Sequence, residues 1–170
     1  GERWFELSVA PVGAERGPAR RFILIARDIT ERHQAQEKMR LTAGVFSNTR
    51  EGIIIADVGG TILDVNEAFT RITGFARSEA IGRNPRILRS GRQDAAFYRT
   101  MWDQLLTQGY WSGEIWNRRR NGEVYPQLLT ISAVRNLQGR TQQYVGLFTD
   151  ITQLKEQQYQ LEHLAHFDSL

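Results

Sequence analysis

The chain contains no cysteine among its 170 residues. Disulfides, thiolate metal sites and cysteine nucleophiles are therefore excluded, and the composition fits a reducing, cytoplasmic location, which we expect. Histidine is scarce as well, and His33, His163 and His166 all lie in stretches with helical patterns. Because these histidines do not form a cluster with metal-ligand spacing, we expect no transition-metal site.

Long apolar runs are also missing. No stretch approaches the roughly 20 apolar residues that a membrane-spanning helix needs, and the first residues lack the layout of a signal peptide. We expect no membrane contact from this segment, and anchoring of the parent protein further upstream is left open. Hydrophobic residues still make up 41 % of the chain, which is enough for one domain of ordinary size with appendages.

Neither sign of charge is in large excess, since 22 Lys and Arg face 19 Asp and Glu. Arginines gather within residues 83–92 and again at residues 118–120. Nucleic-acid binding would need a recognition element beside such patches, and no helix-turn-helix or zinc-finger pattern is present. We therefore expect a solvated basic face and no nucleic-acid partner. No paired nucleophile and base appears, so the chain is expected not to be an enzyme.

An internal repeat organises the chain. The segment from Val9 to Thr30 aligns without a gap with the segment from Ile131 to Thr152, and both end in Asp-Ile-Thr before charged, helix-forming residues. Each copy predicts a β-hairpin and an exit helix. Only the second copy follows enough residues to make a whole domain, so residues 1–30 are expected to be the last strands of an incomplete domain.

The stretch before the second copy predicts a single α+β domain. Two strands, several short helices and three further antiparallel strands follow one another, which places helices on one face of a five-stranded sheet. The amphipathic pattern of residues 95–108 predicts the longest of these helices. The local signals are the turns Gly59-Gly60 and Asn121-Gly122, the helix caps Asn66 and Asp94, and the helix stops Gly74 and Gly109.

This order of elements, together with several short motifs, resembles a PAS domain with its PAC segment over residues 41–152. The motifs are Asn-Glu-Ala-Phe from residue 66, Ile-Gly-Arg-Asn-Pro from residue 81, Asn-Arg-Arg from residue 117 and Asp-Ile-Thr from residue 150. The resemblance implies the PAS fold and a sensory, signal-relay function. Residues 1–30 resemble the C-terminal strands of an upstream PAS domain, residues 31–40 a linker helix and residues 153–170 a signalling helix.

The last residues resemble the lead-in to a GGDEF domain, where His-x-Asp-x-Leu precedes the cyclase fold. His166, Asp168 and Leu170 match this element. The resemblance implies that the chain is a regulatory fragment of a diguanylate cyclase, a cyclic-di-GMP phosphodiesterase or both, with a GGDEF domain downstream. The signalling helix has only a weak coiled-coil seam of leucines, so we expect a homodimer that also depends on contacts between the domains. The alternative for this helix is that it packs back on the sheet of its own domain.

The two Asp-Ile-Thr copies stand where a strand meets a helix. Asp and Thr side chains at such a junction accept hydrogen bonds from the free N–H groups of the first helical turn. In PAS domains this Asp is understood to tie the exit helix to the sheet, so the resemblance implies signal transmission, and a plain helix cap is the alternative. The residues concerned are Asp150, Ile151 and Thr152, and Asp28, Ile29 and Thr30.

PAS domains hold haem, a flavin, small acids or no ligand. Haem needs an axial His, Cys or Met, and no His lies between residues 41 and 152, so haem is not expected. Met101 lies on a helix stripe that is more simply core. Asn117 and Gln127 are amides on adjacent predicted strands, and such amides match the uracil-like edge of a flavin ring.

Individual residues of the chain match or differ from those of flavin-binding PAS domains. Asn84-Pro85-Arg86 stands where the light-sensing flavin PAS domains called LOV have Asn-Cys-Arg, so Pro85 excludes cysteine-adduct photochemistry. Phe148 replaces a LOV glutamine, and Trp102 replaces a phosphate-binding arginine. Redox-sensing FAD PAS domains share the remaining pattern, so FAD is the favoured cofactor, and a ligand-free dimerisation and relay module is the alternative. The expected cofactor-binding residues are Asn84, Arg86, Trp111, Asn117, Gln127 and Phe148.

Overall fold

The computed structural model describes residues 2–12 and 21–167. The chain divides into two compact units, Gly1–Val45 and Phe46–Leu170. Of the three residues that resemble the GGDEF lead-in, Asp168 and Leu170 lie outside the described residues. Among the described helices, none combines the length and the apolar character required to cross a membrane.

The first unit contains one antiparallel hairpin and the beginning of a long helix. Strand β1 (Phe5–Val12) pairs with strand β2 (Arg21–Asp28), so that Phe5 lies opposite Asp28. Helix α1 (Thr30–Asn48) follows and is longer than the residues 31–40 expected for the linker. Large apolar side chains of the hairpin, such as Leu7 and Leu24, are exposed.

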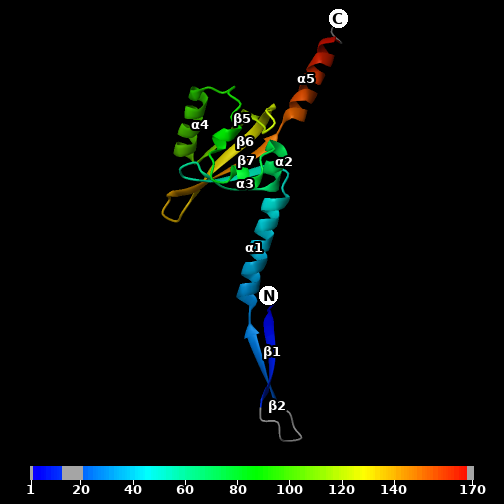
Figure 1. Ribbon diagram of the computed structural model, residues 1–170, viewed down its shortest axis with the longest axis vertical. Coiled ribbons are helices and arrows are strands. Elements are labelled where there is room, and N and C mark those ends of the chain that lie inside the picture. The colour runs from blue at the N-terminus through cyan, green and yellow to red at the C-terminus, as the bar shows by residue number, and fades with distance from the viewer. Residues whose placement is uncertain (1, 13–20, 168–170) are drawn as a thin grey trace. The chain divides into compact units, whose positions relative to one another are not determined.

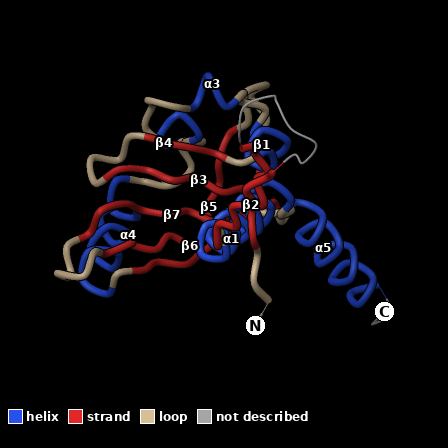
Figure 2. Tube along the Cα trace, turned by 90° about the horizontal axis from the view of Figure 1, so that it is seen from below, coloured by secondary structure: helices blue, strands red, loops and turns tan. Residues whose placement is uncertain are grey.

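The second unit is built on the predicted five-stranded antiparallel sheet. Its strand order is β4-β3-β7-β6-β5, and the strands lie side by side in Figures 1 and 2. The first hairpin turns at Gly59-Gly60 and the second at Asn121-Gly122, as predicted, because Gly60 and Gly122 adopt the positive φ values that these turns require. The strands are β3 (Gly52–Asp57), β4 (Ile62–Val65), β5 (Tyr110–Arg118), β6 (Val124–Arg135) and β7 (Thr141–Asp150).

Along the chain, short helices lie between strand β4 and strand β5. Asn66 and Asp94 cap the first and the longest of them by accepting backbone N–H groups, and Gly74 and Gly109 end them in the left-handed conformation. These four signals were correctly predicted. The segment after residue 84 forms one 3-10 turn. The helices are α2 (Glu67–Thr73), α3 (Arg77–Ala80), η1 (Pro85–Leu88) and α4 (Ala95–Gln108).

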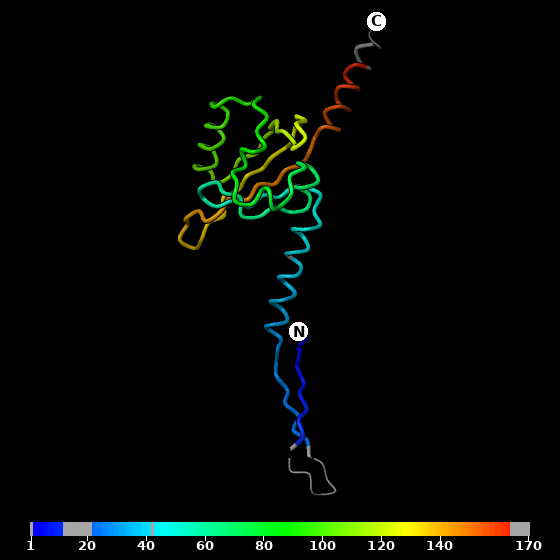
Figure 3. The backbone as a smooth tube through the Cα atoms, in the orientation of Figure 1, coloured from blue at the N-terminus to red at the C-terminus, as the bar shows by residue number. Residues whose placement is uncertain are grey.

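One face of the sheet carries the core, and these helices pack on it. Phe69 of α2 and Leu88 of η1 pack with Ile54 and Phe148, while Met101 of α4 packs in a neighbouring cluster. The last strand continues directly into helix α5 (Thr152–Phe167), which the trace in Figure 3 follows. Strand β7 ends at Asp150 and helix α5 begins at Thr152, so the junction between sheet and helix lies around residue 150.

Candidate functional site

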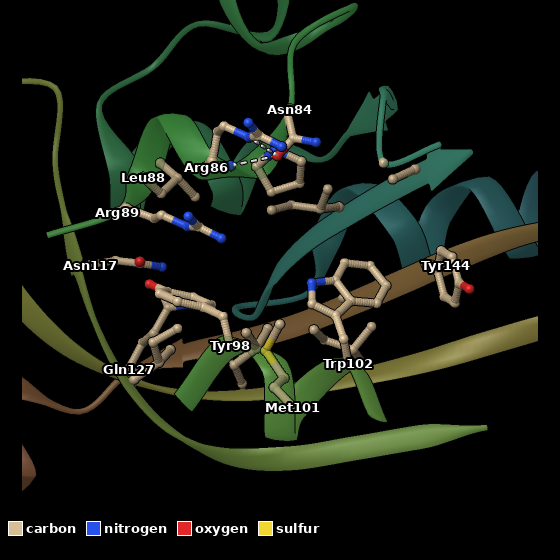
Figure 4. Close-up of a pocket in the computed structure, with 18 of the residues that line it drawn as sticks. Asn84, Arg86, Leu88, Arg89, Tyr98, Met101, Trp102, Asn117, Gln127 and Tyr144 are labelled. Atoms are coloured by element: carbon tan, nitrogen blue, oxygen red, sulfur yellow. Dashed lines mark hydrogen bonds between the residues drawn. The ribbon is translucent and has the colours of Figure 1, made fainter. Parts of the chain in front are cut away.

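A cavity of about 390 Å³ lies between the helix-covered face of the sheet, η1 and α4. Its volume falls in the range of small-molecule sites, about 300–1,000 Å³. The lining is mostly apolar, with polar groups at particular places (Figure 4). No Asp or Glu is among the residues that line it. The lining includes Asn84, Arg86, Arg89, Tyr98, Met101, Trp102, Asn117, Gln127 and Tyr144.

Two buried amides, Asn117 and Gln127, face this cavity from adjacent strands. Their exposed fractions are 6 % and 1 %. In the register of β5 and β6, Asn117 lies opposite Tyr125 and Gln127 opposite Ile115, so the amides are diagonal neighbours rather than a direct pair. Both point to the helix side of the sheet, because they are two residues apart in register.

The Gln127 amide is held in one orientation. Tyr125, which is fully buried, donates its hydroxyl to Oε1 of Gln127 at 2.9 Å. Burial raises the pKa of the Tyr125 hydroxyl, so it stays protonated and remains a donor. Gln127 can therefore offer a ligand its Nε2 donor and the second acceptor site of Oε1.

Tyr98 and Arg89 lie at the same end of the cavity as the two amides (Figure 4). The Arg89 guanidinium carbon is 3.8 Å from the centre of the Tyr98 ring, and Arg89 forms a β-bridge with Asn117. The Tyr98 hydroxyl is buried and, within the described part of the chain, has no hydrogen-bond partner. Burial raises its pKa, against the opposing effect of Arg89. A buried hydroxyl without a partner is costly, so it marks a place where a ligand atom would be stabilising.

Asn84 and Arg86 lie along another side of the cavity, at the start of η1 (Figure 4). The Asn84 Oδ1 atom caps η1 by accepting the backbone N–H of Arg86 at 3.0 Å, and it also accepts Arg86 Nε at 3.2 Å. Gly60 allows the close approach of Asn84, since a Cβ at residue 60 would lie 2.8 Å from Asn84 Nδ2. The guanidinium of Arg86 is therefore positioned by the turn that Asn84 caps.

Trp111 and Phe148 do not line the cavity, although both face the helix side of the sheet. Trp111 packs with Met101 in the core and folds over Gly113, where an added Cβ would meet its ring at 2.8 Å. Phe148 packs edge to face with Phe69. The structure thus brings together Asn84, Arg86, Asn117 and Gln127 and leaves Trp111 and Phe148 outside the group.

The Asp-Ile-Thr segment at residue 150 forms a compact junction. Asp150 Oδ1 accepts the backbone N–H of Thr152 at 2.9 Å and its hydroxyl at 2.6 Å, while Ile151 N donates to the Pro126 carbonyl. Arg119 donates to Asp150 Oδ2 at 2.6 Å. Burial acts to raise the pKa of Asp150, but hydrogen bonds from Thr152 and Arg119 outweigh it and hold the pKa below its usual range.

The first Asp-Ile-Thr copy repeats this junction without the arginine. Asp28 Oδ1 accepts the Thr30 N–H at 2.9 Å, and Ile29 N donates to the Trp4 carbonyl. Among the described residues, no ion pair to Asp28 is present. The cap is thus shared by both copies, whereas the tie to a basic side chain belongs to Asp150.

Arg119 is the main exception to the expected solvated basic face. Its side chain is 17 % exposed, pairs with Asp150 and Glu123, and donates to the Ile72 carbonyl at 2.5 Å. Burial acts to lower the pKa of Arg119, and these two carboxylates raise it overall. Arg119 therefore joins the end of α2, the second hairpin and the start of α5.

Sequence reasoning missed Tyr98, Arg89 and Tyr125 as neighbours of the amides. Tyr98 follows Phe97 on the amphipathic helix, and its position beside the buried stripe was its only signal. Tyr125 precedes Gln127 by two residues and therefore shares its face of β6, which is a signal that spacing alone could have supplied.

Comparison with known proteins places the chain in a family. The sequence profile described as PAS domain matches residues 1–31 and 50–153. A nitrogen fixation regulatory protein of Klebsiella oxytoca is 34 % identical over 100 residues, which are 59 % of this chain and 20 % of the relative. A blue-light-activated histidine kinase of Brucella canis is 33 % identical over 91 residues, 54 % of this chain and 19 % of the relative. The chain thus spans about a fifth of the length of these relatives.

Solved structures agree with this assignment. An RNA-binding Light-Oxygen-Voltage receptor has a TM-score of 0.66 and 26 % sequence identity, over 98 % of this chain and 44 % of that one. The PAS profile covers most of the residues, and the fold agrees with it. The chain therefore belongs to the PAS domain family of sensory signalling modules.

Proposed function

We propose that this chain is a flavin-binding sensory module, with FAD as the favoured ligand, that passes its state to α5. The observation that carries the proposal is the cavity with two buried amides, Asn117 and Gln127, facing its interior. Polar groups at particular places in a mostly apolar cavity orient a ligand that supplies complementary donors and acceptors. The uracil-like edge of an isoalloxazine ring has this pattern.

The other polar groups of the cavity fit the same ligand. Gln127 offers Nε2, Asn117 offers both amide atoms, and the unpartnered Tyr98 hydroxyl lies at their end of the cavity. Arg86 and Arg89 bring positive charge to a lining without carboxylates, which favours a ligand with phosphate groups. Trp102, in contrast, provides an aromatic surface where LOV domains have an arginine.

The chemistry that such a ligand would supply is reversible reduction. Pro85 lines the cavity and the chain has no cysteine, so a flavin-cysteine adduct cannot form. The protein would contribute the hydrogen bonds at the ring edge and the cationic groups. The similarity to a nitrogen fixation regulatory protein and to a blue-light-activated kinase supports a sensory role for the same region of the chain.

The visible absorption spectrum of freshly purified protein, with FAD offered during refolding if it is colourless, tests this function. We expect flavin bands that shift from those of free FAD and that bleach on reduction. A folded protein that retains no flavin after gel filtration would contradict the proposal.

The type of output domain that the module controls is inferred from the last residues of the sequence. His166, Asp168 and Leu170 support a downstream GGDEF domain that makes cyclic diguanylate. The parent protein should then convert GTP into cyclic diguanylate. A histidine-kinase domain after residue 170 would contradict this output.

A dimerisation and relay module without ligand is the second candidate, and the outer sheet face favours it. Leu128, Val134 and Leu147 are all exposed there. Exposed apolar groups on a sheet face favour contact with a second subunit. The apolar side chains of Val45 in α1 and Leu161 in α5 are exposed as well. We propose a homodimer through these surfaces. Light scattering should report twice the chain mass, and a monomer at high concentration would contradict it.

A further inference from the structure

A buried phenol and a buried amide connect the cavity to the sheet. Gln127 lines the cavity, and its Oε1 accepts the hydroxyl of Tyr125. Both side chains are almost fully buried. Any ligand group that moves the Gln127 amide therefore also moves the acceptor of a hydroxyl that cannot reach water. An unsatisfied buried hydroxyl is strongly disfavoured.

The ring face of the same tyrosine contacts a cation. The guanidinium carbon of Arg119 lies 4.0 Å from the centre of the Tyr125 ring. At this distance the ring face attracts the guanidinium, and the contact is strengthened because Arg119 is largely buried. A shift of the Tyr125 ring would therefore displace the guanidinium or weaken its attraction.

Arg119 is the partner of the carboxylate that caps α5. Its Nη2 atom donates to Asp150 Oδ2, and the other carboxylate oxygen accepts the N–H of Thr152, the first residue of the helix. Asp150 also lies directly opposite Gln127 in the register of β6 and β7, so both ends of this path are on the same face of the sheet.

We infer that these contacts form one relay, from the Gln127 amide through the Tyr125 ring to the cap of α5 at Thr152. Its input rests on the proposed flavin function, because a change of hydrogen bonding at the ring edge would act on Nε2 of Gln127. Tyr125 is the positioning residue of the relay, since it contacts both the cavity amide and the guanidinium.

Hydrogen exchange of the Thr152 amide tests the relay in the full chain without any ligand. Gln127→Leu leaves the Tyr125 hydroxyl buried without its acceptor, so we expect exchange at Thr152 to accelerate about fivefold or more. The double variant Gln127→Leu with Tyr125→Phe removes the stranded hydroxyl and should restore slow exchange. A merely structural role of Gln127 would also be rescued in the double variant, but Gln127→Leu would then accelerate exchange throughout the sheet, including the amides of β3, and not selectively at Thr152.

A matched control comes from the same sheet face. Tyr144 is 9 % exposed and lines the cavity, but its ring packs against Trp102, whereas Arg119 lies over the ring of Tyr125. Tyr144→Phe should leave exchange at Thr152 within about twofold of wild type. The amides of β3 serve as an internal measure that each variant is folded. Unchanged exchange in Gln127→Leu, or no restoration in the double variant, would overturn the relay.

A second measurement uses the flavin. In wild type with FAD, reduction should change exchange at Thr152, and in Tyr125→Phe with the same flavin content it should not. If wild type binds no flavin, the proposed function fails and the ligand-free comparison still decides the relay. If flavin binds and Tyr125→Phe responds like wild type, the relay fails and the function stands.

Discussion

The guanidinium of Arg119 and the carboxylate of Asp150 lie 2.6 Å apart, although 31 positions separate them in the chain. This contact distinguishes the second Asp-Ile-Thr segment from the first. We predict that Asp150→Asn lowers the free energy of unfolding of the second unit by about 1–3 kcal/mol, because it weakens a charged hydrogen bond of a largely buried arginine. Urea denaturation followed by tryptophan fluorescence measures this loss.

The control for this variant is Asp28→Asn. Asp28 caps α1 in the same way, and no ion pair to it is described. The substitution should leave the unfolding midpoint of the second unit unchanged. Equal effects of the two variants on that midpoint would show that Arg119 contributes nothing at Asp150.

Acid should weaken the same junction. The pKa of Asp150 is held below its usual range in the folded protein, whereas an unfolded aspartate titrates at about pH 4. The contribution is therefore complete above that pH and is lost as the pH falls through the folded pKa. The loss of stability between about pH 5 and pH 2 should be smaller in Asp150→Asn than in wild type, since Asp64 and the other carboxylates titrate in both. Parallel pH profiles would contradict this.

Tyr98→Phe should affect stability and binding in opposite directions. Removing the unpartnered hydroxyl should leave the ligand-free protein as stable or up to about 1 kcal/mol more stable. Affinity for FAD should fall about three- to tenfold, because a hydrogen bond to the ligand is lost. Isothermal titration measures the second effect.

Asn117→Ala is the companion variant at the same end of the cavity. It should lower FAD affinity by about ten- to a hundredfold, since a polar ligand edge would be left without a partner. If either variant is equally folded and binds FAD like wild type, its side chain is not a ligand contact.

Gly52→Ala should destabilise the sheet. A Cβ at residue 52 would lie within 2.2 Å of the Phe148 ring, which faces it across β3 and β7. We expect a cost of about 1–3 kcal/mol from overpacking, measured as a lower unfolding midpoint. Gly44→Ala is the control, because no atom lies within 4 Å of a Cβ there, and it should not destabilise α1. A neutral Gly52→Ala would show that the Phe148 ring relaxes without cost.

Local sequence signals predicted the elements of the second unit and several of their ends, whereas helix α1 is longer than the expected linker of residues 31–40. Asn66 and Asp94 cap their helices, Gly74 ends one, and Asn121-Gly122 makes the second turn, as predicted. These features depend on hydrogen bonds and backbone angles within a few neighbouring residues, so a short stretch contains all the information. Alternation along a strand likewise specifies which residues share a face, and Asn117 and Gln127 lie on the same face of the sheet.

Tertiary packing determines where each side chain lies along that face and which groups it contacts. Phe148 and Gln127 both point to the helix side, but Phe148 packs over Gly52 and against Phe69, outside the cavity, while Gln127 lines it. Arg119 looked like one of several solvated arginines until the fold placed it beside Asp150. Period and spacing specify the face of a strand, whereas side-chain conformation and partners depend on groups that are distant in sequence and are brought together only by packing.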